Sequence, residues 1–260
     1  MPLQSQFRGQ KFENWLEELG NGSLNDECDY VITPQALRCS THDIGDLINF
    51  AYPSIHVTQS DDYFRQRCIL APHEREVHEI NEIASKQFPG PVREAWSAEE
   101  AIDARTKLPN HDFPIEFLRS ITHSDFPLGE LSPKVGCPVV FLRNIGHIPA
   151  GRRGIITKID TFDLKVRMLS GEDVFVPRFE LEFTDRSLSI ELKRTQFPLA
   201  FAFAMTIDKA QEQTFSAVGI DLRHPCLTHG PLYYALSRAH SPAGIVGTNA
   251  RESKTKNVVY

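Results

Sequence analysis

The chain has 260 residues, 41% of them hydrophobic and 24% charged, which is enough for a buried core in one domain with a smaller second one. The longest apolar run, residues 198–205, is too short to cross a bilayer, and the amino terminus lacks a signal-peptide pattern, so we expect a soluble, intracellular protein. Five scattered cysteines argue against a disulfide framework and a zinc ribbon. The net charge of −6 is not typical of a chromatin-type DNA binder, although a motor that grips one strand needs only local cations.

The amino-terminal part of the chain predicts helices that alternate with a strand. Apolar residues recur at helical spacing in three places, and a short apolar run before a proline is typical of a strand. Ser40 or Thr41 is placed to cap the second helix, and Pro53 ends it. We therefore expect a helix over about residues 10–19, a second from the cap at Ser40 or Thr41 to the residue before Pro53, a strand over 68–71 and a helix over 74–87.

The middle of the chain changes character twice. From residue 88 to 132 the periodicity fades and prolines recur, which indicates a long irregular connection. Residues 133–185 then carry short apolar segments, and the turn Ser170-Gly-Glu between two of them is typical of a hairpin. Four or five strands in about fifty residues predict a small antiparallel β-barrel.

After residue 186 the alternation of strands and helices resumes. We expect a strand that ends at Met205, a helix from about Asp208, a strand over 218–222, a helix over 231–238 and a strand over 244–246. The simplest fold class is therefore α/β, with one domain interrupted by a β insertion.

The segment 206–214, TIDKAQEQT, places polar residues directly after an apolar run. A hydroxyl, a lysine and amides at the end of a strand are well placed to hold phosphates, because polar strand ends favour anions. The alternative is a polar cap on an ordinary buried strand. That alternative accounts for the apolar half of the segment but not for the whole string.

The segment 229–238, HGPLYYALSR, ends in Arg238 after an apolar helical stripe. Leu232 and Leu236 lie four residues apart and bury the helix, which leaves Arg238 at its carboxyl end, where the helix dipole favours a cation. The alternative is a surface arginine on an amphipathic helix.

Together these two segments resemble the last two motifs of superfamily-one DNA helicases of the Pif/Helitron type. Three further stretches resemble other motifs of that family: residues 3–10 (LQSQFRGQ) with Arg8, residues 68–83 with Asn81, and residues 134–144 (KVGCPVVFLRN). The resemblance covers nearly the whole chain. For the short stretch around Arg8 alone, a solvated arginine before a helix is the alternative.

The resemblance implies a RecA-like second motor domain of the P-loop NTPase type with an inserted small antiparallel β-barrel. In that arrangement residues 1–87 and 186–260 form the motor domain. Residues 88–132 form the connection, and residues 133–185 form the barrel.

The resemblance also implies roles for individual residues. Arg238 and Arg8 would be catalytic, and Arg238 would be the arginine finger that stabilises charge on the transferred phosphoryl group, a contribution worth ~10³ to 10⁵ in rate. The residues implied to bind the ATP cofactor are Arg8, Gln211, Gln213 and Arg238. The residues implied to bind DNA are Thr206, Lys209 and Gln211.

The sequence departs from the family pattern in two respects. None of the 15 glycines is followed by lysine, and no acidic pair ends an apolar strand, so this sequence lacks the phosphate loop and the magnesium-binding acids of the first motor domain. Within the motifs, Asp208, Glu212 and Pro231 stand where the family has other residues. The two acids should weaken DNA binding through bulk and repulsion of phosphate.

A metal site is a further candidate where His224, Cys226 and His229 cluster. No second cluster completes four ligands, so we predict no metal. A serine hydrolase is disfavoured because the sequence has no Gly-x-Ser-x-Gly.

Two functions stay open. The first is the carboxyl-terminal part of an ATP-dependent, 5′-to-3′ DNA helicase that uses ATP and Mg²⁺ and acts on single-stranded or forked DNA. By resemblance it would serve DNA repair, recombination, telomere maintenance or Helitron transposition, in the nucleus. It would need the missing first RecA-like domain in cis or in trans and would be inactive alone. The second is a non-catalytic remnant that binds DNA or a protein weakly.

Overall fold

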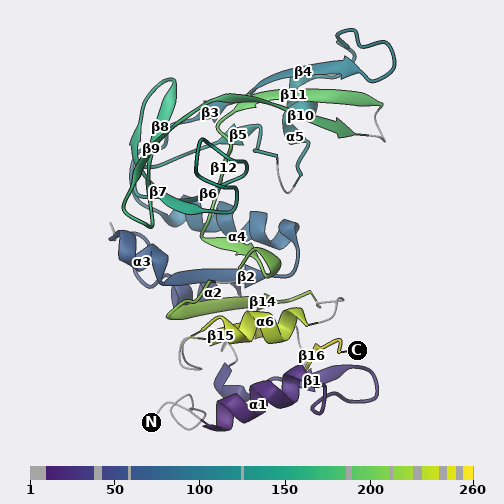
Figure 1. The fold of residues 1–260 in the computed structure, drawn as a ribbon, viewed down its shortest axis with the longest axis vertical. Coiled ribbons are helices and arrows are strands. Elements are labelled where there is room, and N and C mark those ends of the chain that lie inside the picture. Colours follow the sequence, from purple (N-terminus) through teal and green to yellow (C-terminus); the bar gives the residue numbers. More distant parts are fainter. Residues whose placement is uncertain are drawn as a thin grey trace. The chain divides into compact units, whose positions relative to one another are not determined.

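The computed structural model describes residues 10–37, 43–57, 60–123, 126–185, 189–210, 213–224, 230–239, 245–249 and 254–259. The chain divides into two compact units (Figure 1): unit 1 comprises Met1–Gln87 and Phe203–Tyr260, and unit 2 comprises Phe88–Ala202. Among the described residues, no helix has the length and the hydropathy that a membrane crossing requires.

Unit 1 is built on a four-stranded parallel sheet in the order β13-β2-β14-β15. Its first segment supplies α1 (Gln10–Gly20), β1 (Tyr30–Ile32), the short 3-10 helix η2 (Gln35–Leu37), α2 (Ile44–Ala51), α3 (Asp61–Arg65), β2 (Arg67–Ala71) and α4 (Glu74–Gln87). Its second segment supplies β13 (Ala204–Thr206), the 3-10 helix η3 (Asp208–Ala210), β14 (Ala217–Leu222), α6 (Pro231–Ser237), β15 (Ile245–Asn249) and β16 (Lys254–Lys256). The last strand pairs with β1 in a separate antiparallel ribbon.

Helices cover both faces of the parallel sheet (Figure 1). Successive side chains of a strand point to opposite faces, so Cys68 and Leu70 join the core beneath α1 and α6, whereas Ile69 points to the face that α2 covers. Gly219 of β14 allows α2 to come close, because a Cβ there would lie 3.0 Å from the side chain of Leu47. The arrangement explains why β2 is apolar without alternation, as is typical of strands in parallel sheets buried on both faces.

Asn81 of α4 fixes the edge strand β13. Its side-chain Nδ2 donates to the carbonyl of Ala204 at 3.2 Å, and its Oδ1 accepts from the Ala204 amide at 2.9 Å. The side chain thus satisfies the two backbone groups that a neighbouring strand would otherwise bond, and it is buried with them. This contact holds β13, and with it Thr206, in place.

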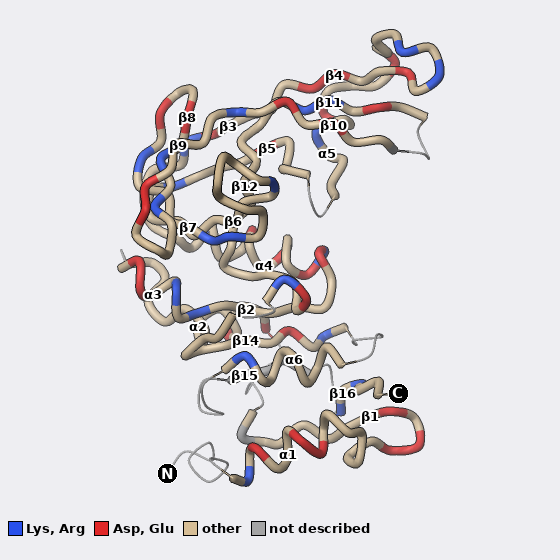
Figure 2. The backbone as a smooth tube through the Cα atoms, viewed as in Figure 1, with Lys and Arg blue, Asp and Glu red and all other residues tan. Residues whose placement is uncertain are grey.

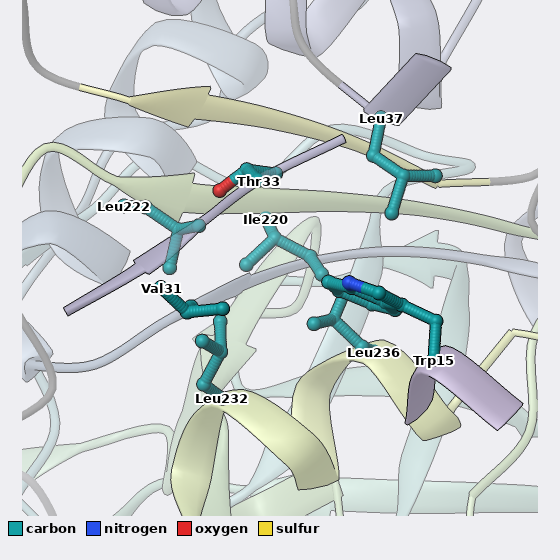
Figure 3. A pocket seen from close by; sticks show the side chains of 8 residues that line it. All are labelled: Trp15, Val31, Thr33, Leu37, Ile220, Leu222, Leu232 and Leu236. Carbon is teal, nitrogen blue, oxygen red and sulfur yellow. The ribbon is translucent and has the colours of Figure 1, made fainter. Parts of the chain in front are cut away.

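A small cavity lies in the core between α1, β14 and α6 (Figure 3). Trp15 of α1 and Leu232 and Leu236 of α6 converge there on Ile220 and Leu222 of β14. Its volume is about 10 Å³, which is the size of one water molecule's probe sphere. Its lining is almost entirely apolar. It is a packing void of the core and not a ligand site.

Unit 2 consists mainly of antiparallel strands. Its elements are β3 (Ala95–Trp96), β4 (Ala98–Asp103), α5 (Ile115–Ser120), β5 (Glu130–Leu131), β6 (Pro138–Phe141), β7 (Arg153–Ile159), β8 (Asp163–Met168), β9 (Asp173–Pro177), β10 (Phe179–Asp185), β11 (Ile190–Gln196) and β12 (Leu199–Phe201). The strands form a five-stranded sheet in the order β12-β6-β7-β8-β9, a three-stranded sheet in the order β10-β11-β4 and the ribbon β3-β5.

The predicted barrel is not found as a closed structure. Among the described strands, β12 and β9 are the two edges of the five-stranded sheet and do not pair with each other. The predicted hairpin is confirmed: β8 and β9 pair around a turn in which Gly171 has φ of 96°, a conformation that favours glycine. Strand content was therefore predictable here, whereas closure was not.

Two other predictions for this region differ from the structure. Residues 88–132 are not irregular throughout, because they contain β3, β4, α5 and β5. The apolar run 198–205 is not one strand, since β12 belongs to unit 2 and β13 to unit 1. Strand β4 has few apolar residues, and its partner β11 lies about ninety residues further along the chain, so local periodicity could not reveal the pair.

Arg194 organises the smaller core of unit 2. Its side chain is fully buried, as is that of Glu99, and its Nε donates to Glu99 Oε1 at 2.7 Å. The guanidinium also donates to the carbonyls of Leu118 at 2.7 Å and Pro127 at 2.6 Å, and it lies over the ring of Phe126. A single buried charge thus joins β11 to β4, to α5 and to the loop that follows α5.

Candidate functional site

The carboxyl ends of the parallel strands in unit 1 carry two of the polar residues that the sequence singles out, Thr206 and Lys209. Strand β13 ends at Thr206 and leads into η3, β2 leads into α4, and β14 leads to Arg223. In open α/β sheets, ligands bind outside the carboxyl ends of the strands. This edge of the sheet is therefore the first place to look for a site.

Thr206 is buried at this edge, with 4% of the residue exposed. Its Oγ1 makes no hydrogen bond within the part of the chain that the structure describes. A buried hydroxyl without a partner carries a desolvation cost of about 1–3 kcal/mol. Such a group gains free energy when a hydrogen-bonding ligand or water reaches it.

Lys209 lies one turn further, in η3. Its Nζ lies 2.8 Å from Oε1 of Glu74, the first residue of α4, and both side chains are partly exposed. The main chain of Lys209 accepts a bond from Gln213 Nε2 at 3.3 Å. Asp208 beside it is exposed. The lysine that the sequence assigns to DNA thus has an acid as its partner, and a phosphate would have to displace that acid.

A second group at this edge was missed from the sequence. Glu76 of α4 is buried, with 1% of its side chain exposed, and its Oε1 lies 3.1 Å from Arg75 Nη2 and 2.9 Å from His224 Nδ1. Nη2 of Arg75 also lies 3.0 Å from His224 Nε2. Because a guanidinium only donates, Nε2 of His224 can only be the acceptor in this contact.

A third group joins β14 to α4. Arg223 donates to the buried carboxylate of Asp221 at 2.8 Å and to Glu79 at 2.7 Å. Burial alone would lower the pKa of the Arg223 guanidinium, but the hydrogen bonds to the two acids outweigh it and raise the pKa. The sequence signals this network only through the charged residues that follow β2 and β14. In the structure these residues form a network of paired charges at the ends of the two strands.

Arg238 lies elsewhere in unit 1, at the carboxyl end of α6. Its Nε donates to the carbonyl of Tyr234 at 3.2 Å and its Nη2 bonds the hydroxyl of Ser237 at 3.1 Å. Its own carbonyl accepts from the amide of Phe215 at 2.8 Å, two residues before β14 begins. Arg238 is therefore at the amino end of β14, roughly 15–20 Å along the strand direction from the edge that holds Thr206.

The structure thus separates the predicted site residues into two places. Thr206 and Lys209 lie at the carboxyl ends of the strands, whereas Arg238 lies beside the stretch that follows Gln213. Arg8 and Gln211 lie outside the described residues, as do Glu212, Cys226 and His229. Pro231 takes the first position of α6, where a missing amide hydrogen costs nothing. No group of three metal-ligating side chains was found among the residues that the structure describes.

The parallel sheet, the helices on both faces and the polar strand ends define a mixed α/β fold of the kind found in RecA-like motor domains.

No family model matches the chain. The chain is similar to the ATP-dependent DNA helicase Pif1 of Bdellovibrio bacteriovorus, with 35% identity over 130 residues, 48% of this chain and 29% of the relative. It is similar to the ATP-dependent DNA helicase PIF1 of Homo sapiens, with 29% identity over 185 residues, 68% of this chain and 26% of the relative.

Solved structures agree on the fold. The crystal structure of Pif1 helicase from Bacteroides in complex with ADP-AlF3 and ssDNA matches with a TM-score of 0.62 and 24% identity, over 97% of this chain and 52% of that one. The crystal structure of Pif1 helicase from Candida albicans matches with a TM-score of 0.60 and 21% identity, over 94% of this chain and 54% of that one. The chain is thus similar to Pif1-type DNA helicases, and it spans less than a third of the length of the two curated relatives.

Proposed function

We propose that this chain is the carboxyl-terminal part of an ATP-dependent, 5′-to-3′ DNA helicase. Unit 1 would be the second RecA-like motor domain, and unit 2 would be an insertion that contains the five-stranded antiparallel sheet. The observation that carries the proposal is the position of the segment 206–214. It leaves the carboxyl end of a buried parallel strand, where a motor domain meets its ligands.

In this proposal the chain's own residues hold and orient the substrates. Thr206 offers a buried hydroxyl that has no hydrogen-bond partner among the described residues, and Lys209 offers a cation at the same edge. Both would contact the DNA backbone, together with Gln211. Exchange of the Glu74 carboxylate for a phosphate would keep the lysine paired, and the partly exposed carboxylate would turn to water.

Arg238 would act on the nucleotide, together with Arg8, Gln211 and Gln213. Its guanidinium is now held by its own helix, through Tyr234 and Ser237, and would have to turn outward to reach a phosphoryl group. A fixed positive charge there stabilises the charge that develops during phosphoryl transfer. When bound, ATP supplies the phosphoryl group and Mg²⁺ neutralises its oxygens; both would be held mainly by the first motor domain.

The proposed partners are single-stranded or forked DNA and a first RecA-like domain, in cis or in trans. DNA repair, recombination, telomere maintenance and Helitron transposition are the proposed settings, in the nucleus. The test is DNA-stimulated release of phosphate from ATP by the purified 260 residues, alone and with a separately purified first RecA-like domain. We expect no turnover above background alone and restored turnover with the added domain. Turnover by the chain alone would contradict the proposal.

A non-catalytic DNA- or protein-binding remnant is the second candidate. It is favoured by the strand-end network, in which Arg75, Lys209 and Arg223 each have a carboxylate partner. Failure of the added domain to restore turnover, with weak DNA binding retained, would support this second function over the first.

A further inference from the structure

Trp96 is an exposed aromatic residue of unit 2 whose ring is held on two sides. It lies in β3, and 44% of the residue is exposed. Its indole Nε1 donates to Glu94 Oε2 at 3.2 Å, and the guanidinium carbon of Arg119 lies 4.9 Å from the ring centre, over one face. The ring is therefore oriented in advance while a large part of its surface remains in water.

Arg119 is itself fixed on the ring. Its Nη2 donates to the carbonyl of Ser97, the residue after Trp96, at 3.0 Å. Helix α5 can come this close because residue 129 is glycine: a Cβ at Gly129 would lie 2.7 Å from Cα of Arg119. The cation over the ring is thus built into the backbone packing of unit 2 and is not a chance position of a surface side chain.

Two more arginine–aromatic pairs adjoin Trp96. Nη1 of Arg178 donates to the carbonyl of Trp96 at 2.5 Å, and its guanidinium carbon lies 4.8 Å from the ring centre of Phe197. The next residue, Phe179, lies 5.3 Å from the guanidinium carbon of Arg143. We call these six residues the arginine–aromatic array.

The array is cationic in a chain whose net charge is −6. Figure 2 shows acidic residues gathered on α1 and on the loop before β1, in unit 1. The array itself contributes three arginines. Two acids stand beside the ring: Glu94 accepts a bond from the indole Nε1, and Glu130 lies opposite Trp96 in the β3–β5 pair. An aromatic face beside guanidinium groups is the combination that binds single-stranded DNA without sequence preference.

We propose that Trp96 is a stacking platform for an unpaired base of single-stranded DNA, with Arg119 and Arg178 attracting the adjoining phosphates. The base stacks on the exposed part of the indole ring. This site lies outside the helicase-like motifs, and it rests on the proposed function in that the chain must handle DNA. It would be a contact that recognises bases as flat surfaces and not by their sequence.

The two tryptophans of the chain allow a direct test, because Trp15 lies in unit 1 and Trp96 in unit 2. A Trp15→Phe variant leaves Trp96 as the only tryptophan reporter. We expect its fluorescence to be quenched by an oligothymidylate, and much less by an abasic single strand of the same length and charge. Quenching of equal size by both strands would overturn the inference, since the ring would then sense the backbone and not the bases.

Affinity provides the second readout, by anisotropy of a labelled oligothymidylate. Trp96→Ala should weaken binding by about 5- to 100-fold, the range expected for one base stacked on an aromatic ring. Trp96→Phe should retain most of the affinity. Phe162→Ala is the matched control, because it removes an aromatic residue that is 81% exposed and outside the array, and it should change nothing.

The two proposals fail in different ways. If anisotropy shows DNA binding but Trp96→Ala binds as the parent chain does, the stacking site is wrong and the proposed function stands. If no DNA binds at any salt concentration, both are wrong.

Discussion

The ammonium group of Lys209 lies 2.8 Å from the carboxylate of Glu74, so the lysine assigned to DNA is already paired within unit 1. Both side chains are partly exposed, and such pairs contribute about 0–1 kcal/mol. A phosphate can therefore displace the acid at small cost. The pair would lower DNA affinity without preventing binding.

Glu74→Gln should accordingly tighten binding of single-stranded DNA by up to about fivefold, because the lysine loses its competing anion. Anisotropy titration at fixed salt measures the change. Glu82→Gln is the matched control: it removes the same charge from the same helix, from a pair with Lys86. An equal gain in both variants would show that net charge alone is responsible.

The double variant Asp208→Asn with Glu212→Gly should also tighten DNA binding and steepen its salt dependence. Removing anions that repel phosphate allows more counterions to be released on binding, and the slope of log affinity against log salt reports their number. Asp61→Asn with Asp62→Asn, on α3, removes the same number of charges elsewhere in unit 1. If both slopes stay at the parent value, the segment 206–214 does not face DNA.

Arg194→Met should destabilise unit 2 by about 3–5 kcal/mol, because it leaves the buried carboxylate of Glu99 without its cation. Adding Glu99→Leu to the same chain should recover part of that loss. Urea denaturation followed by Trp96 fluorescence in the Trp15→Phe background measures the stability of unit 2. The control is Arg167→Met, whose pair with Asp173 is partly exposed and should be worth about 1 kcal/mol or less. A similar loss in both variants would contradict the role given to Arg194.

Cys137 should resist alkylation in the native protein. Burial raises the pKa of its thiol to about 12, so at pH 8 only about one molecule in 10⁴ carries the reactive thiolate. Cys28 is exposed and should be modified by iodoacetamide at this pH. Peptide mass spectrometry of native and urea-treated samples compares the two sites. Modification of Cys137 at the rate of Cys28 in the native sample would contradict its burial.

Much of the fold follows from local sequence patterns. The apolar stripe from Phe12 to Leu19 predicts α1, and the apolar run at residues 68–71 with the following helical pattern predicts β2 and α4. The second helix begins at Ile44 with Asp43 as its N-cap, which accepts a bond from the Gly45 amide, so the expected cap at Ser40 or Thr41 is wrong. These features depend on neighbours within one or two turns, so sequence alone is sufficient.

Non-local contacts were not predictable in the same way. Strand β4 pairs with β11, and the helix expected from Asp208 is only the three-residue η3. Tertiary packing limits the length of η3, because only ten residues lie between the end of β13 and the start of β14. The chain must return within them to the amino end of the parallel strands, which leaves no room for a longer helix.

The resemblance to Pif1-type helicases can be read without coordinates, because the motifs are strings of residue types in a fixed order. Which of those residues meet depends on how the chain folds. It pairs Lys209 with Glu74, places Arg238 at the other edge of the sheet, and joins Trp96 to Arg119 and Arg178. Contacts of this kind arise between residues far apart in the chain, and their geometry depends on how strands and helices pack.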